Sequence, residues 1–199
     1  GLERTTLLGT DFDIIYHLAA NARIQPSFQK PLEYFEIDAL GTNKVLELAR
    51  NCGAKVVYAG SSSAFGGPML NPYAFAKYTG EQLCEMYSKV FGVSTVIARF
   101  FNVYGPKSRT TGAYGAVFGV FLTQKLFNKP LTIVGSGKQT RDFVHVYDLV
   151  NGLILAAKRG KPGEAYNIGG GKEISVNYIA KLIGGKKIYI PRRPGEPSR

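Results

Sequence analysis

The sequence has little cysteine, no long apolar run and no block of like charge. Its two cysteines, Cys52 and Cys84, offer neither a disulfide framework nor metal-ligand spacing within 199 residues. We therefore expect a reducing, cytoplasmic compartment and no metal site. No apolar stretch approaches the roughly 20 residues that a membrane span needs, and no secretory signal opens the sequence, so we expect no membrane association.

Positive charge exceeds negative charge, but the basic residues are scattered. The formal net charge is +11, and bases gather only near the end, in "GGKKIYIPRRPGEPSR". A diffuse basic balance is weak support for nucleic-acid binding, whereas a small anionic substrate needs only a few of these charges. With 45% apolar residues and no low-complexity tract, the composition is typical of a globular protein without a nucleic-acid partner.

Apolar runs alternate with segments of helical period in the first half of the chain. The predicted strands are "FDIIYHLAA" (12–20), with Ile14, Ile15 and Tyr16 buried at its centre, "KVVYAGSSS" (55–63) and "STVIARFFNVYG" (94–105). The predicted helices cover 31–53 and 73–92, and end at Gly53 and Gly92. This order favours a Rossmann-like, doubly wound α/β fold, in which helices cover both faces of a parallel sheet.

The texture changes from Pro106 onward. A loop is followed by a predicted helix at 116–128, and then by strand, turn, strand and helix over 131–157. The same order recurs over 163–183, where "IGGG" at 168–171 reads as a turn. We expect a smaller α/β substrate lobe made of 106–141 and 159–199, while 1–105 and 142–158 form the sheet domain.

Small residues follow three of the predicted strands, in "HLAA" (17–20), "GSSSAFG" (60–66) and "RFFNVYG" (99–105). Ligands of open parallel sheets bind at the carboxyl edge of the strands, and small residues leave room there for a flat group. In "NPYAFAKYTGEQ" (71–82), Tyr73 and Lys77 are four positions apart. On a helix this spacing puts them on one face, where an ammonium group favours the ionised form of a phenol.

The motifs "HLAA", "GSSSAFG", "PYAFAK", "RFFNVYGP", "QTRDFVHVYDL" and "RPGEP" occur in this order. Together they resemble the extended short-chain dehydrogenase/reductase family, and within it the nucleotide-sugar epimerases typified by UDP-glucose 4-epimerase. The resemblance implies NAD as cofactor and a UDP-sugar as substrate. It implies epimerisation at C4 of a UDP-hexose through a transient 4-keto intermediate. It also implies a homodimer joined through the helices at 31–52 and 73–91.

The resemblance assigns catalytic roles to Ser61, Tyr73 and Lys77. Tyr73 is the expected general acid–base, and Lys77, together with a nicotinamide cation, is expected to bring the phenol pKa from about 10 to near 7. Lys77 would also bind the nicotinamide ribose. Ser61 is the second hydroxyl, although its neighbours Ser62 and Ser63 could be confused with it. The expected cofactor contacts are Leu18, Ala19, Ala20, Ser61, Tyr73, Lys77 and Phe100, and the expected substrate contacts are Ser61, Tyr73, Asn102, Arg141 and Arg193.

Several assignments have alternatives. Arg192 could replace Arg193 at the diphosphate, and Arg141 could instead pair with Asp142. The two histidines, His17 and His145, read better as structural residues than as catalytic ones.

Related dehydratases carry an acidic residue directly after the catalytic hydroxyl, where this sequence has Ser62 and Ser63. The absence of an acidic residue at these positions favours an epimerase, since elimination of water needs an acid–base group there. A dehydratase or reductase, and a catalytically silent nucleotide-binding protein, are the alternative functions.

The sequence also departs from the family pattern. The glycine-rich phosphate loop is absent, Asp38 stands where the family usually has asparagine, and only five residues join Gly66 to Pro72. We expect that the numbering passes over gaps at mobile loops near the ligands, and that a first βαβ unit is missing.

Overall fold

Four parallel strands form the larger sheet of the computed structural model, which describes residues 12–110 and 116–195. Their order across the sheet is β1-β2-β3-β7. The strands are β1 (Ile14–His17), β2 (Lys55–Ser61), β3 (Thr95–Phe100) and β7 (Ala165–Ile168).

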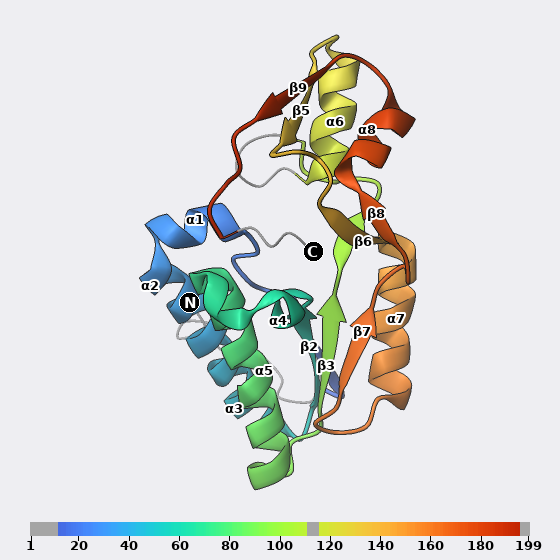
Figure 1. Cartoon of the computed structure of the whole chain (residues 1–199). Helices are drawn as coiled ribbons and strands as arrows, with labels where there is room; N and C mark the ends of the chain where they lie inside the picture. Colours follow the sequence, from blue (N-terminus) through green and yellow to red (C-terminus); the bar gives the residue numbers. More distant parts are fainter. Residues whose placement is uncertain (1–11, 111–115, 196–199) are drawn as a thin grey trace.

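Helices cover both faces of this sheet, as predicted (Figure 1). On one face lie the π-helix η1 (Phe35–Leu40), α3 (Gly41–Cys52) and α5 (Pro72–Phe91), with α1 (Ile24–Gln29) and α2 (Pro31–Tyr34) beside them. The other face is covered by α7 (Val146–Arg159). Helices α3 and α5 end where predicted, because Gly53 and Gly92 adopt left-handed φ values of 74° and 69°, which glycine adopts at no steric cost.

Two apolar cores hold these three layers together. The first, between β2 and the helices α3 and α5, contains Leu46, Tyr58, Cys84 and Tyr87 among its buried residues. Helix α5 carries Gly80 in its interior because a β-carbon there would overlap the ring and hydroxyl of Tyr58. The second core packs α7 on the opposite face of the sheet, through Val57, Val96, Ala98, Leu153, Ala156 and Ala157.

Strand β1 forms where predicted, but the expectation that its centre is buried is wrong. Ile14 is 39% exposed and Tyr16 is 42% exposed, whereas His17 is buried. The reason is its place in the sheet, since β1 pairs with β2 alone among the described strands.

A short helical connection joins Gly66 to Pro72. It leaves α4 (Ser63–Gly66), forms a 3-10 turn η2 (Pro68–Leu70) and reaches Asn71, the N-cap of α5. The amide of Leu70 donates to the carbonyl of Gly67 at 3.2 Å. The expectation of a gap within this connection stays a prediction, and the expected gap at Thr10–Asp11 lies outside the described residues.

The smaller lobe contains two further sheets. Strands β4 (Asn102–Tyr104), β6 (Thr140–His145) and β8 (Glu173–Ser175) form one, and β5 (Leu131–Val134) pairs with β9 (Lys187–Ile190) in the other. Helices α6 (Val117–Leu126) and α8 (Val176–Ile183) pack on β5. The core of this lobe includes Phe121, Leu131, Ile133 and Ile179.

Two details of the predicted division are wrong. The strand expected over 94–105 is split at Phe101, so that β3 belongs to the larger sheet and β4 to a separate one. The sequence predicts that 159–199 lies wholly in the smaller lobe, but β7 within it pairs with β3. The chain therefore returns to the larger sheet as far as Ile168.

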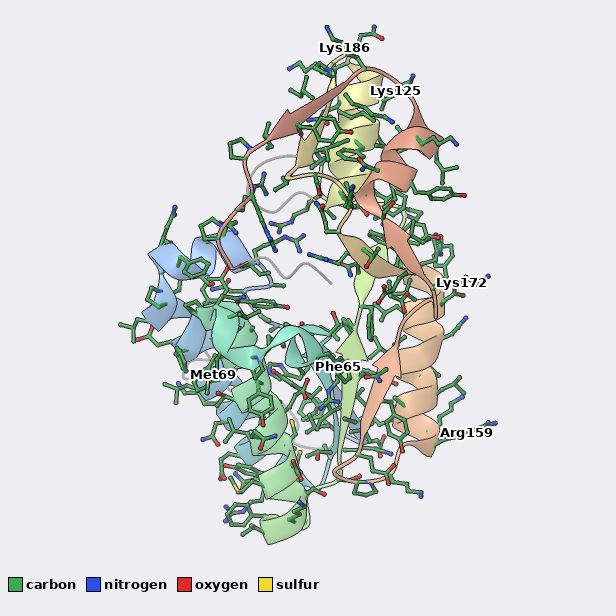
Figure 2. The ribbon with its side chains drawn as sticks, in the orientation of Figure 1. Phe65, Met69, Lys125, Arg159, Lys172 and Lys186 are labelled. Atoms are coloured by element: carbon green, nitrogen blue, oxygen red, sulfur yellow. The ribbon has the colours of Figure 1, made fainter. Side chains whose placement is uncertain are left out.

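Basic side chains are spread over the molecule. Figure 2 shows Lys125 and Lys186 at the outer end of the smaller lobe, far from Arg159 on α7 and from Lys172. In the part of the chain that the structure describes, no helix is long and apolar enough to cross a membrane.

Candidate active site

The predicted catalytic hydroxyls meet at the carboxyl end of β2. Ser61 is the last residue of β2, and Tyr73 lies in the first turn of α5. The Tyr73 hydroxyl donates a hydrogen bond of 3.3 Å to Ser61 Oγ. Asn71 sets the start of the helix, because its side-chain oxygen accepts from the amide of Ala74 at 2.8 Å. The ring of Tyr73 is held edge-on by Tyr34, with the ring centres 6.3 Å apart.

Ser61, rather than its neighbours, faces Tyr73. Ser63 turns back onto it, donating to Ser61 Oγ from its hydroxyl at 2.8 Å and from its amide at 3.2 Å. Ser61 Oγ therefore accepts from Tyr73 and from Ser63 together. The position that an acidic residue occupies in dehydratases instead holds a hydroxyl that supports Ser61.

Lys77 lies one helical turn beyond Tyr73 and is 4% exposed. Its ammonium sits over the ring of Tyr58, 4.3 Å from the ring centre. No ion pair or hydrogen bond joins its Nζ to another residue in the ranges 12–110 and 116–195. Burial lowers the pKa of Lys77 from 10.5 to about 8, against the opposing effect of Asp38, Cys84 and Glu81.

In the protein alone the pKa of Tyr73 is raised, and the expected shift toward 7, which includes the charge of a bound nicotinamide, stays a prediction. Burial raises the pKa of Tyr73 above its usual 10, and the charge of Asp38 raises it further. The hydrogen bond with Ser61 and the charge of Arg23 act in the opposite direction but do not prevail. Tyr73 is therefore a neutral phenol until more positive charge is brought beside it.

Beneath the site, a buried polar chain links β1 to η1. Thr42 Oγ1 donates to the carbonyl of Asp38 at 2.6 Å, and it therefore accepts from His17 Nε2 at 2.9 Å. Burial, followed by the charge of Lys77, lowers the pKa of His17 to about 4. His17 is thus a neutral structural residue, as predicted.

Asp38, where the family usually has asparagine, is 1% exposed. One of its carboxylate oxygens accepts from the amide of Asn21 at 2.6 Å, and the other has no hydrogen-bond partner among the described residues. Burial raises the pKa of Asp38 from 3.8 to about 6, although Asn21 and Lys77 oppose this.

The predicted cofactor contacts lie along one edge of the sheet. Leu18, Ala19 and Ala20 directly follow β1, and Phe100 ends β3 in register with Ser61. Leu18 is 51% exposed. The structure thus brings these residues to the same edge as Ser61 and Tyr73.

Asp142 joins two of the predicted substrate contacts. Its carboxylate oxygens accept from the amides of Gly170 and Gly171, at 2.7 and 3.0 Å, and its carbonyl accepts from Asn102 Nδ2 at 3.1 Å. The glycine run is therefore a turn closed by an internal anion, as expected. Arg141 precedes Asp142 on β6 and donates from Nη1 to the carbonyl of Thr140 at 2.7 Å.

The segment carrying Arg192 and Arg193 leaves β9 and returns to the larger domain. The carbonyl of Pro194 accepts from Gln25 Nε2 at 2.8 Å, and that of Gly195 accepts from Asn71 Nδ2 at 3.2 Å. Both arginines are exposed. The segment is therefore tied to the residue that caps the helix of Tyr73.

His145 is placed by its neighbours rather than by the site. Its Nδ1 accepts from the amide of Tyr147 at 3.4 Å at the start of α7, and its ring meets Tyr104 edge-on with the ring centres 5.3 Å apart. This agrees with its structural interpretation.

Sequence reasoning missed Glu81 and Arg99. Glu81 lies on the face of α5 that carries Tyr73 and Lys77, and it is ion-paired with Arg99 on β3 at 2.8 Å. Its spacing from Lys77, four residues, was the available signal.

Comparisons with known proteins agree with these motifs. Residues 3–169 match the family model "NAD dependent epimerase/dehydratase family". The Bacillus subtilis protein named "Uncharacterized UDP-glucose epimerase YtcB" is 37% identical over 94% of this chain and 64% of its own length.

Among the solved structures with a similar fold are two UDP-sugar epimerases. The UDP-glucuronic acid 4-epimerase of Bacillus cereus, in complex with UDP-glucuronic acid and NAD, gives a TM-score of 0.86 at 33% identity, over 94% of this chain and 65% of the other. The UDP-glucose 4-epimerase of Thermotoga maritima, with UDP-glucose, gives 0.88 at 28% identity, over 94% and 66%. This chain thus spans about two thirds of the length of these proteins.

Proposed function

Because this chain belongs to the NAD-dependent epimerase/dehydratase family, we propose that it is an epimerase of a nucleotide-diphosphate sugar. Its substrate is a UDP-hexose, which it inverts at C4 through a transient 4-keto intermediate. One observation carries this proposal: Tyr73 and Ser61 share a hydrogen bond of 3.3 Å at the edge of the sheet, with buried Lys77 one turn away.

The residues at this edge fit the cofactor of the family. Lys77 offers a buried ammonium that makes no ion pair or hydrogen bond with the described residues, and ribose hydroxyls are suitable acceptors for it. The residues that follow β1 leave room at this edge of the sheet, because Leu18 and Ala19 are exposed and Ala20 is half-buried. When bound, NAD supplies the site with a hydride acceptor that can return the hydride.

The proposed chemistry needs Tyr73 as a base and then as an acid. Tyr73 takes the proton of the C4 hydroxyl as the hydride leaves that carbon, and it returns the proton once the opposite face has been reduced. Ser61 holds the same sugar oxygen. To lower the pKa from above 10 to near 7 requires at least about 4 kcal/mol of preference for the phenolate, which the described residues alone do not provide.

Substrate diphosphate would lie between the two lobes in this proposal. Arg141 and Asn102 approach it from β6 and β4, and Arg193 from the segment after β9. Arginine suits this role because its planar fork matches paired phosphate oxygens.

An epimerase is favoured over a dehydratase by the residues around Ser61. Ser62 and Ser63 supply hydroxyls where elimination needs an acid, and Ser63 is bound to Ser61 itself. The nearby carboxylate of Glu81 is ion-paired with Arg99.

The test is incubation with UDP-glucose, UDP-N-acetylglucosamine and UDP-glucuronate, each with added NAD, followed by sugar analysis. We expect one of them to yield its C4 epimer. Release of a product of changed redox state would instead indicate a dehydratase or reductase. Retention of NAD without turnover of any sugar would indicate a silent nucleotide-binding protein.

We also propose a cytoplasmic homodimer that packs through α3 and α5. Met86 and Val90 on α5 are 37% and 65% exposed, which suits an interface. The two cysteines are unpaired, which suits a reducing compartment.

A further inference from the structure

Glu81 is a buried carboxylate that the proposed chemistry does not use. It is 1% exposed and lies on α5, eight residues after Tyr73. Its Oε2 accepts from Arg99 Nε at 2.9 Å and pairs with Arg99 Nη2 at 2.8 Å. A buried charge needs such a partner, because an unpaired one loses its hydration without compensation.

The other oxygen of Glu81 reaches the end of β2. The amide of Ser61 donates to Glu81 Oε1 in a long hydrogen bond of 3.4 Å. Pairing between β1 and β2 ends at His17 and Tyr58, so Ser61 lies beyond that ladder. In the ladder with β3 the amide of the next residue, Ser62, donates to the carbonyl of Phe100 at 2.9 Å. Glu81 therefore accepts from an amide that has no partner in the described strands.

Gly60 makes this approach possible. A β-carbon at Gly60 would lie 2.7 Å from Glu81 Oε1 and 3.2 Å from Arg99 Cγ. Gly60 pairs with Arg99 in the register between β2 and β3. The Glu81 carboxylate thus packs against the backbone of Gly60, one residue before the end of β2.

Helix α5 consequently holds Ser61 at two points. Tyr73 binds its hydroxyl at 3.3 Å, and Glu81 binds its amide. Arg99 anchors Glu81 from β3, and its guanidinium lies over the ring of Phe65 at 5.2 Å. Figure 2 shows Phe65 near the centre of the molecule, in the larger domain.

We propose that Glu81, held by Arg99, is a positioning residue that fixes Ser61 in the register required for its contact with Tyr73. This inference rests on the proposed function, since the value of that contact lies in catalysis. In this role Glu81 touches neither substrate nor cofactor. It acts through Ser61.

The test is a double-mutant cycle. Glu81→Gln keeps the shape of the side chain but removes its charge, and we expect it to lower kcat about tenfold with KM within about twofold. In a Ser61→Ala background the same change should lower kcat less than about twofold, because the residue through which Glu81 acts is already disabled. Equal losses in both backgrounds, or no loss in either, would overturn the proposal.

Two further variants make the result specific. Glu85→Gln is the matched control, because Glu85 lies one turn further along α5 in an exposed pair with Lys89, and kcat should stay unchanged. Arg99→Lys keeps the charge but loses the fork, and we expect a smaller loss in the same direction. Arg99→Lys also carries the test if Glu81→Gln does not fold.

Hydrogen exchange gives a reading that does not depend on activity. In Glu81→Gln the amide of Ser61 should exchange about tenfold faster than in the wild type, whereas Glu85→Gln should leave it unchanged. Unchanged exchange in Glu81→Gln would refute the inference even if the wild type epimerises a sugar. Faster exchange in a protein that turns over no sugar would support the positioning while refuting the proposed function.

Discussion

The ammonium of Lys77 lies 4.3 Å from the centre of the Tyr58 ring, and both side chains are buried. The Tyr58 hydroxyl donates to the carbonyl of Lys77 itself at 3.2 Å. A single tyrosine thus contacts the charge of Lys77 through its face and the backbone of Lys77 through its hydroxyl. This holds Lys77 in place without neutralising it, which leaves the charge available to a ligand.

Lys77→Met should raise stability and abolish turnover. Because burial lowers the pKa of Lys77 from 10.5 to about 8, the folded state binds fewer protons than the unfolded state between these values. Wild-type stability therefore rises with pH from about 8 to 10.5, and below pH 8 the penalty is complete, up to about 3 kcal/mol. Urea unfolding should show the variant to be more stable at pH 7, with the difference shrinking by pH 10. A variant that is less stable at pH 7 would contradict this.

His17→Gln should remove an acid sensitivity. The pKa of His17 falls from 6.5 to about 4 on folding, so below pH 6.5 the unfolded state takes up a proton that the folded state refuses. The stability due to neutral His17 is complete above pH 6.5 and is lost, by about 3 kcal/mol, as the pH falls to about 4. Glutamine can still donate to Thr42. The comparison is thermal unfolding of both proteins from pH 7 to pH 4, and parallel curves would refute the assignment.

Asp38→Asn should have the opposite pH dependence. The pKa of Asp38 rises from 3.8 to about 6 on folding, so ionisation destabilises the fold progressively as the pH rises between these values. At pH 7 the variant should be more stable by up to about 3 kcal/mol. In the wild type this effect and that of His17 oppose each other from about pH 4 to 6. Each single variant should therefore reveal a slope that the wild type conceals, and a flat difference between wild type and Asp38→Asn would exclude the buried charge.

Tyr73→Phe should lower turnover by about three orders of magnitude or more, because the acid–base group is removed. Its ring contact with Tyr34 should persist, and Ser61 keeps its bonds from Ser63. We therefore expect an unchanged melting temperature and retained NAD, measured by absorbance after denaturation. The control is Tyr78→Phe, on the same helix but outside the site. Turnover within tenfold of the wild type in Tyr73→Phe would remove Tyr73 from the acid–base role.

Local signals predicted much of the fold. Gly53 and Gly92 mark helix ends that the structure confirms, and the Asn-Pro-Tyr sequence at 71–73 starts α5 with a side-chain cap. The pairing of Tyr73 with Ser61 followed from the resemblance to the family. These features depend on residues close in sequence or on a recognisable family pattern.

Features that depend on tertiary neighbours could not be predicted. The exposure of Ile14 and Tyr16 depends on which strands flank β1. The pKa of Tyr73 depends on its burial and on Asp38, and the pairing of Glu81 with Arg99 depends on how α5 lies across β3. Neither the exposure of a strand, nor a pKa, nor an ion pair between a helix and a strand can be inferred from the periodicity of the sequence.

The bonds of Asp142 have a mechanical consequence for the substrate lobe. Its carboxylate accepts from two amides of the glycine turn, and its carbonyl accepts from Asn102. These three bonds restrain the backbone next to Arg141. In the proposed function, a substrate diphosphate would therefore meet Arg141 on a backbone that is ordered before binding. The segment that carries Arg193 follows β9, and it is hydrogen-bonded to Asn71, the N-cap of α5. Binding of the nucleotide by Arg193 would therefore be coupled, through Asn71, to the position of Tyr73 at the start of α5.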